Sequence, residues 1–277
     1  MKQYYSIRQN AKSVLLYVAV GVILLFFVFP IFWACLAAFK SRLDLFSQIP
    51  TLIFKPTLSN FRDVFYQQPF LKYLKNSLII AGCTTAVTVS MSAYAGYLIN
   101  RFRIGGPHIS FWILTLRMMP PVVIIIPYFL IFRVMRLLDT YLALVLMYSV
   151  MNFPLAMWLM MGFFQEVPRE LEEASWIDGC SLWKGFISVV LPLVLPGIVV
   201  ASLFTFIFSW NEFLFAVVLS RDHARTAPVG ITLYIQIREI LWGQLMASGI
   251  LAIAPVVVIA MFIRKYLIRG LMLGALK

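Results

Sequence analysis

Long stretches without charge are the feature that most constrains the fold of this chain. Six stretches of 23 to 27 residues hold a single Lys, Arg, Asp or Glu between them, Arg117. About 20 apolar residues in a helix cross the hydrocarbon core of a bilayer. Only 12% of the residues are charged, against roughly 25% in an ordinary soluble domain. The sequence therefore predicts an all-α, polytopic membrane protein and excludes an ordinary soluble enzyme.

Six transmembrane helices are predicted within a single membrane domain, residues 1–277. We place the spans at residues 13–39, 77–99, 107–132, 141–164, 189–219 and 241–263. Because the number of spans is even, both termini lie on the same side of the membrane. Basic residues are equally numerous in the loops of the two sides, but the segments after the second and sixth spans are denser in them, which favours cytoplasmic termini.

The net charge of +12 and the three cysteines narrow the choice of partners. An excess of Lys and Arg in a membrane chain belongs to loops that face anionic lipid, so we predict contact with membrane lipid and none with nucleic acid.

Cys35, Cys83 and Cys180 have no C-x-x-C spacing, which argues against a metal site. The first apolar stretch is too long for a cleavable signal peptide and is interpreted as a retained helix.

The loop of residues 165–184, between the fourth and fifth spans, is the acidic segment of the chain, with five of its 11 Asp and Glu residues. We predict a short helix, a turn and the start of a second helix. Pro168 suits the first turn of the helix, Gly179 its end, and Ser181 the cap of the next helix. Glu172 and Glu173 are adjacent and point about 100° apart, which argues against a paired-carboxylate active site. We interpret them as solvated charges or as contacts to a partner.

A spaced motif occupies this loop. Glu173-Ala174-Ser175 is followed after three residues by Gly179 and, nine residues later, by Val189-Val190-Leu191-Pro192. The spacing resembles the cytoplasmic EAA signature of ABC importer membrane subunits, with departures at Ser175, Cys180 and Val189. The resemblance extends over nearly the whole chain, and within the ABC importers it is to the carbohydrate permeases of the maltose-transporter type. Other segments that look like this family are Asn76-Ser77, Ala93-Tyr94-Ala95, Arg117-Met118-Met119-Pro120-Pro121, Leu138-Asp139-Thr140-Tyr141, Trp210-Asn211-Glu212-Phe213, Arg269-Gly270-Leu271 and Gly274-Ala275-Leu276-Lys277.

The resemblance implies a type I ABC importer permease fold in the inner membrane of a bacterium or archaeon, and the import of a sugar or sugar derivative. It implies three partners: a dimer of ATPase subunits, a second, different permease subunit and an extracytoplasmic sugar-binding protein. The acidic loop would lie in the cytoplasm as a coupling helix docked on an ATPase. The residues that this role would involve are Glu172, Glu173, Ala174, Ser175, Ile177, Asp178 and Gly179.

The chain has no G-x-x-x-x-G-K-[ST] phosphate loop. We therefore expect a non-catalytic subunit that binds no cofactor, with ATP and Mg²⁺ used by the partner ATPase.

Polar side chains inside the spans are costly unless they face protein or water. Arg117 lies in the third span, and we expect it to pair with a helix end or with carbonyl groups near Pro120 and Pro121; contact with the transport path is the alternative. Thr84, Thr88, Ser92 and Gly96 recur every four residues in the second span. Such a stripe of small residues favours close helix packing, with the lining of a path as the alternative.

The fourth and fifth spans hold the other candidates for the transport path. Ser209 and Asn211 are interpreted as substrate contacts, with hydrogen bonds between helices as the alternative, and Asn152 is a further candidate. Glu212 is interpreted as part of an ion pair or a gate. In the same span Pro192 and Pro196 predict a break in the helix.

The competing hypothesis is a self-sufficient membrane protein, either an ion-coupled transporter or an intramembrane enzyme. Either one needs acidic residues at mid-membrane or a catalytic set of side chains there. Only Arg117 and Glu212 interrupt the spans. The sequence therefore favours the permease subunit, and it leaves the identity of the sugar open.

Overall fold

The computed structural model describes residues 2–49, 51–106 and 108–274. The last three residues of the family-like tail, Ala275, Leu276 and Lys277, lie outside the described residues.

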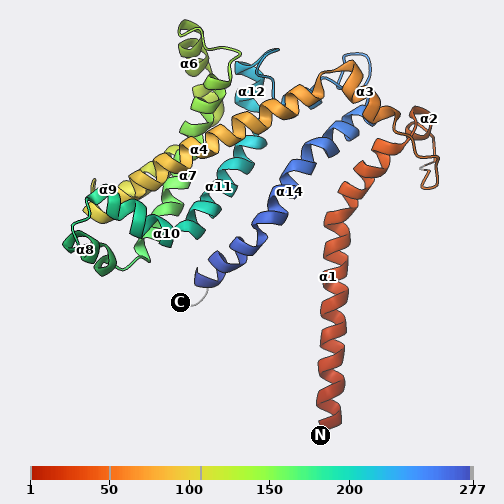
Figure 1. Ribbon diagram of the computed structural model, residues 1–277. Helices are drawn as coiled ribbons and strands as arrows, with labels where there is room; N and C mark the ends of the chain where they lie inside the picture. Colours follow the sequence, from red (N-terminus) through yellow and green to blue (C-terminus); the bar gives the residue numbers. More distant parts are fainter. Residues whose placement is uncertain (1, 50, 107, 275–277) are drawn as a thin grey trace. The chain divides into compact units, whose positions relative to one another are not determined.

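The described residues fold almost entirely into helices (Figure 1). Their one β pairing is an isolated antiparallel bridge between Ile235 and Ile240. The helices are α1 (Lys2–Phe39), α2 (Arg42–Leu45), α3 (Ser59–Gln67), α4 (Phe70–Phe102), α5 (Ile109–Thr115), α6 (Pro121–Val134), α7 (Tyr141–Gln165), α8 (Arg169–Ile177), α9 (Leu182–Gly185), α10 (Leu191–Leu193), α11 (Leu195–Trp210), α12 (Leu214–Leu219), α13 (Ala227–Thr232) and α14 (Trp242–Gly274), with a 3-10 turn at Leu116–Met118 and a π-helical turn at Phe186–Val190. The predicted all-α class is confirmed.

Among the described residues, four helical segments are individually long and apolar enough to cross a membrane: Ser13–Phe39, Phe70–Phe102, Tyr141–Gln165 and Trp242–Met261. Two further pairs of helices meet the same criterion together but are bent, by 88° between Met118 and Pro121 and by 78° between Leu193 and Leu195. The count reaches the predicted six when each bent pair is taken as one span.

Prolines account for the two bends. Met119 and Pro120 each precede a proline and have ψ angles of 125° and 124°, outside the helical range, because the following proline ring disfavours that range. In the second bent pair, Pro196 cannot donate an N–H to the preceding turn, and the chain turns at Val194. The break that Pro192 and Pro196 predict is therefore present.

Contacts divide the chain into two compact units, residues 1–69 with 231–251, and residues 70–230 with 252–277. In the first unit the amide of Asn60 donates hydrogen bonds of 2.8 Å to the carbonyls of Ala38 and Lys40. Gly243 allows this contact, because a Cβ there would lie 2.3 Å from Asn60 Oδ1. The single membrane domain expected from the sequence stays a prediction.

The core of the second unit is the packing of α4 against α7, with α11 beside both (Figure 1). Thr84, Thr88, Ser92 and Gly96 of α4 are all buried. At Gly96 a Cβ would already touch α7, at 3.4 Å from the side chain of Met161. At Gly96 the two helix backbones thus approach closely, as the packing interpretation of the stripe expects. The lining of a path, the alternative for the stripe, stays a prediction.

Asp139, in the loop between α6 and α7, holds the loop that follows α12. Its carboxylate accepts hydrogen bonds from the backbone N–H groups of Arg221, Asp222, His223 and Ala224, at 2.8 to 3.2 Å. Burial alone would raise the pKa of the Asp139 carboxyl. The four backbone donors together lower the pKa by more than burial raises it, so the pKa lies below its ordinary value. The ionised carboxylate therefore ties the two loops together.

Replacing Asp139 with Asn should lower the free energy of unfolding by about 1–3 kcal/mol near pH 7. The NH₂ group of the amide would face backbone N–H groups, and two donors cannot form a hydrogen bond with each other. A carboxyl whose folded pKa is depressed stabilises the fold above its unfolded pKa of about 3.9 and loses that effect as the pH falls through the folded value. The difference in thermal stability between wild type and Asp139→Asn should thus be full above about pH 4 and shrink below it.

The control for this experiment is Asp222→Asn, because the Asp222 side chain is 92% exposed and contacts only Arg225 as an ion pair. It should cost well under about 1 kcal/mol. Equal losses of stability in the two variants would contradict the role of Asp139.

Candidate functional site

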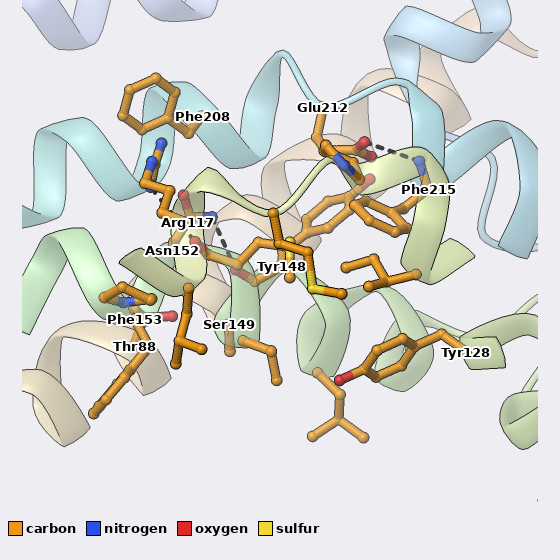
Figure 2. Close-up of a pocket in the computed structure, with 18 of the residues that line it drawn as sticks. Thr88, Arg117, Tyr128, Tyr148, Ser149, Asn152, Phe153, Phe208, Glu212 and Phe215 are labelled. Atoms are coloured by element: carbon orange, nitrogen blue, oxygen red, sulfur yellow. Dashed lines mark hydrogen bonds between the residues drawn. The ribbon is translucent and has the colours of Figure 1, made fainter. Parts of the chain in front are cut away.

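A cavity of about 750 Å³ lies in the second unit. Its walls come from α4, the 3-10 turn, α6, α7 and the stretch from Phe208 to Phe215, and most of its surface is apolar. The polar side chains among its lining residues are Thr88, Arg117, Tyr128, Tyr148, Ser149, Asn152 and Glu212 (Figure 2). An apolar cavity with a few polar groups is the usual form of a small-molecule site.

Arg117 enters the cavity from the 3-10 turn, beside Phe208 of α11 (Figure 2). The guanidinium carbon lies 4.5 Å from the centre of the Phe208 ring, and Nη1 donates a long hydrogen bond, 3.5 Å, to the carbonyl of Met151 on α7. The prediction of carbonyl partners near Pro120 and Pro121 is wrong. The 88° bend turns α6 away at those prolines, and the side chain finds its acceptor on α7 instead.

Asn152 is buried and connects α7 to α11. Its amide donates to the carbonyl of Tyr148 at 2.9 Å and to the hydroxyl of Ser209 at 3.2 Å. Asn152 also lines the cavity, whereas Ser209 is not among the lining residues. The hydrogen bond between helices, the alternative considered for Ser209, is therefore present in the structure.

Asn211 and Glu212 lie where α11 ends. Asn211 is exposed, donates to the carbonyl of Ile207 at 2.8 Å, and is not among the residues that line the cavity. Its part in the transport path stays a prediction. Glu212 does line the cavity, and its carboxylate accepts from the N–H groups of Phe215 and Ala216 at 2.8 and 3.1 Å (Figure 2).

The predicted ion pair of Glu212 is wrong within the part of the chain that the structure describes. The break after Trp210 starts a new helix, α12, whose first N–H groups lack partners in the helix. These donors and the positive end of the helix dipole stabilise the carboxylate in place of a basic side chain.

Sequence reasoning missed several lining residues. Thr88 belongs to a stripe interpreted as packing, with the lining of a path as the alternative, and no local pattern marked Ser149, Tyr128 or Phe208. The hydroxyls of Thr88 and Ser149 are buried with no hydrogen-bond partner among the described residues. Only their placement in three dimensions shows that they flank a cavity.

The acidic loop forms the predicted helix, turn and helix. Gly179 ends the segment with a φ of +85°, a conformation that favours glycine. The hydroxyl of Ser181 accepts from the N–H of Lys184 and caps α9. Five residues of the motif are exposed on α8 and the turn: Glu173, Ala174, Ile177, Asp178 and Gly179.

Glu172, in contrast, is only 1% exposed. It accepts a hydrogen bond from the hydroxyl of Tyr97 and forms an ion pair with Arg101, both on α4. The interpretation of Glu172 as a solvated charge is wrong. Ser175 is buried as well and donates to the backbone carbonyl of Glu172 at 2.7 Å.

The sequence of the chain matches a known family. Residues 86–272 match the family described as "Binding-protein-dependent transport system inner membrane component". The chain belongs to this family. It is 35% identical over 271 residues to a trehalose/maltose transport system permease protein of Thermococcus litoralis, with 96% of this chain and 97% of the relative covered.

Two further comparisons agree with membership of this transport family. The chain is 32% identical over 264 residues to a sulfoquinovosyl glycerol transport system permease protein of Agrobacterium fabrum, with 94% of this chain and 93% of the relative covered. A chain in the crystal structure of a bacterial ABC transporter involved in the import of the acidic polysaccharide alginate is similar in fold. The TM-score is 0.79 at 20% identity, with 93% of this chain and 96% of that chain covered. This inner membrane component therefore has the fold of an ABC importer permease.

The contrast between Asn152 and Asn211 is testable in the assembled complex. Asn152→Leu leaves the Tyr148 carbonyl and the Ser209 hydroxyl without their partner, so it should lower the free energy of unfolding by about 1–3 kcal/mol. Asn211→Leu, on an exposed side chain, should change it by less than about 0.5 kcal/mol. Thermal unfolding in detergent measures both, and equal losses would contradict the structural role of Asn152.

Proposed function

We propose that this chain is the permease subunit of an ATP-driven importer that carries a sugar or sugar derivative into the cytoplasm. The observation that carries the proposal is the environment of α8. Its buried side is anchored to α4 through Glu172. Its other side is exposed, with Glu173, Ala174, Ile177 and the following Gly179. Relatives named for trehalose/maltose and for sulfoquinovosyl glycerol support the class of substrate.

The exposed side of α8 suits docking on a partner ATPase. Ile177 is 86% exposed, so its apolar side chain is available to a partner surface. Ala174 beside it is small enough for close approach, and Glu173 and Asp178 offer charge to a basic rim. In this proposal the chain itself is non-catalytic and binds no cofactor, and the ATPase dimer uses ATP and Mg²⁺. Glu172 and Ser175 support the helix from its buried side.

The proposed assembly contains a second, different permease subunit and an extracytoplasmic sugar-binding protein. It lies in the inner membrane of a bacterium or archaeon with both termini of this chain in the cytoplasm. That orientation puts α8 on the side where ATP is available.

The cavity is the proposed part of the sugar path within this chain. A sugar that leaves water must replace its hydrogen bonds, since each buried group left unpaired costs about 1–3 kcal/mol. Arg117 and Asn152 offer hydrogen-bonding groups at the cavity, and the ring of Phe208 offers an apolar surface for the C–H face of a sugar ring.

The competing hypothesis of an ion-coupled transporter finds no support in this cavity. Such a transporter needs an acidic side chain that can exchange an ion. Glu212 is the acidic residue among those that line the cavity, and backbone N–H groups of α12 already occupy its carboxylate.

Substitution of Gly179 tests the coupling role of the loop. Gly179→Val should strain the turn by about 1–2 kcal/mol, because β-branched residues disfavour positive φ. The complex should still assemble, but its trehalose uptake per ATP hydrolysed should fall roughly tenfold. Gly179→Asn is the matched control, since Asn tolerates this conformation. No Cβ clash confounds the comparison, because open space surrounds Gly179. Wild-type uptake and hydrolysis in Gly179→Val would contradict the docking role.

Labelling from outside intact cells tests the proposed orientation. On a background without the native cysteines, Arg169→Cys on α8 should be shielded from an impermeant thiol reagent, and Asp222→Cys after α12 should react. Both native side chains are exposed within the chain, so that the membrane alone decides the difference. The opposite pattern would overturn the orientation and the assignment of the loop.

A further inference from the structure

A buried charge cluster, Glu172, Arg101 and Tyr97, joins the loop to the cytoplasmic end of α4. Glu172 accepts from the Tyr97 hydroxyl and pairs with Arg101, whose side chain is only 10% exposed. Arg101 Nη2 also donates to the carbonyl of Arg169, the first residue of α8, at 3.2 Å. Figure 1 shows α8 beside this end of α4. Two side chains of α4 thus hold both the first turn and the middle of α8.

Burial makes this contact decisive for the position of α8. A carboxylate taken out of water is strongly disfavoured unless a charge partner and hydrogen bonds replace its hydration. Moving α8 away from α4 would leave Glu172 and Arg101 each without its partner. Small displacements of α8 are therefore resisted, and a displacement that occurs must take the end of α4 with it.

The helix α4 leads directly from this cluster to the cavity. It has no proline between Phe70 and Phe102, so its hydrogen bonds run without a break. Arg101 and Thr88 are 13 residues apart, which is about 20 Å along a helix. Val87, Thr88 and Met91 of α4 form part of the cavity wall.

The helix α7 provides the second connection. It contributes Asn152 and Ser149 to the cavity wall and continues through three residues into α8. The loop is thus joined to the cavity through the covalent chain on α7 and through side chains on α4, and the two helices pack on each other along their length. With the cluster broken, α8 would remain attached through α7 alone.

We propose that Glu172 is a positioning residue of energy coupling, which fixes α8 to α4 through Arg101 and Tyr97 so that motion of the loop reaches the cavity wall. The proposal rests on the function proposed above, in which an ATPase moves α8. Glu172 differs in this from its neighbour Glu173, which is exposed and available to a partner.

The first experiment compares two charge-neutralising variants of the same helix. Glu172→Gln and Glu170→Gln each remove one carboxylate from α8, but Glu170 is exposed. In proteoliposomes with all partner subunits and the binding protein, Glu172→Gln should hydrolyse ATP and take up about tenfold less trehalose per ATP, within the range of known coupling free energies. Glu170→Gln should keep the wild-type ratio. A wild-type ratio in Glu172→Gln would overturn the proposal.

A double variant separates coupling from simple loss of stability. Arg101→Gln with Glu172→Gln removes both buried charges, so it should assemble at least as well as Glu172→Gln, which leaves Arg101 unpaired. It lacks the ion pair, however, and its uptake per ATP should stay low. Recovery of wild-type coupling in the double variant would mean that Glu172 serves stability alone.

The second experiment measures a distance and needs no sugar. Spin labels at Phe102→Cys and Leu171→Cys, both exposed positions, report the distance between α4 and α8 in the complex. In the wild type, the distance distribution should be the same without nucleotide and after trapping with ATP and vanadate. Retained nucleotide verifies the trapping. Glu172→Gln should broaden the distance distribution. A shift on trapping in the wild-type cluster would overturn the proposal.

The two experiments separate this proposal from the function on which it rests. If the wild-type and Glu170→Gln complexes take up no trehalose, trehalose is not the sugar that this complex carries, and the label distances still decide whether α8 and α4 move together. If they take it up and Glu172→Gln does so equally well, the proposed function stands and the role of Glu172 is refuted.

Discussion

Close packing of α4 against α7 is the contact on which both the cavity and the loop depend. The two helices approach each other because α4 presents Thr84, Thr88, Ser92 and Gly96 at the interface. In a membrane, apolar surface alone gives little reason for helices to associate, and small residues that allow close contact supply it. One region of this helix pair forms walls of the cavity, and the end of α4 at Arg101 carries α8.

The charged side chains of the membrane region, Glu212 and Arg117, lie at breaks in the helices and form hydrogen bonds with backbone groups. Glu212 is held by the N–H groups of α12, a helix that begins only because α11 ends at Trp210. Arg117 reaches the cavity from a turn beside the bend at Pro120 and Pro121. In both places irregular backbone borders the cavity, where exposed N–H and C=O groups are tolerated. The features that interrupt the spans are therefore the features that give the cavity its polar groups.

The apolar runs, the prolines and the spaced loop motif were enough to predict the helical class, the candidate spans, the break near Pro192 and Pro196, and the helix that ends at Gly179. Partners across space were not predictable. Glu172 and Glu173 are adjacent and chemically identical, and only the position of α4 shows that one is buried and the other exposed. Arg117 and Glu212 were recognised as costly charges, but their partners Met151, Phe208 and Phe215 carry no local signal.

In the proposed function, an ATPase acting on the loop drives transport through this chain. Uptake into proteoliposomes that hold the complete complex tests this function, with ATP inside and, outside, the binding protein and the sugar that it binds. Uptake should require ATP, stop with vanadate and be unaffected by a protonophore. Uptake that proceeds without ATP and collapses when the proton gradient is dissipated would contradict it.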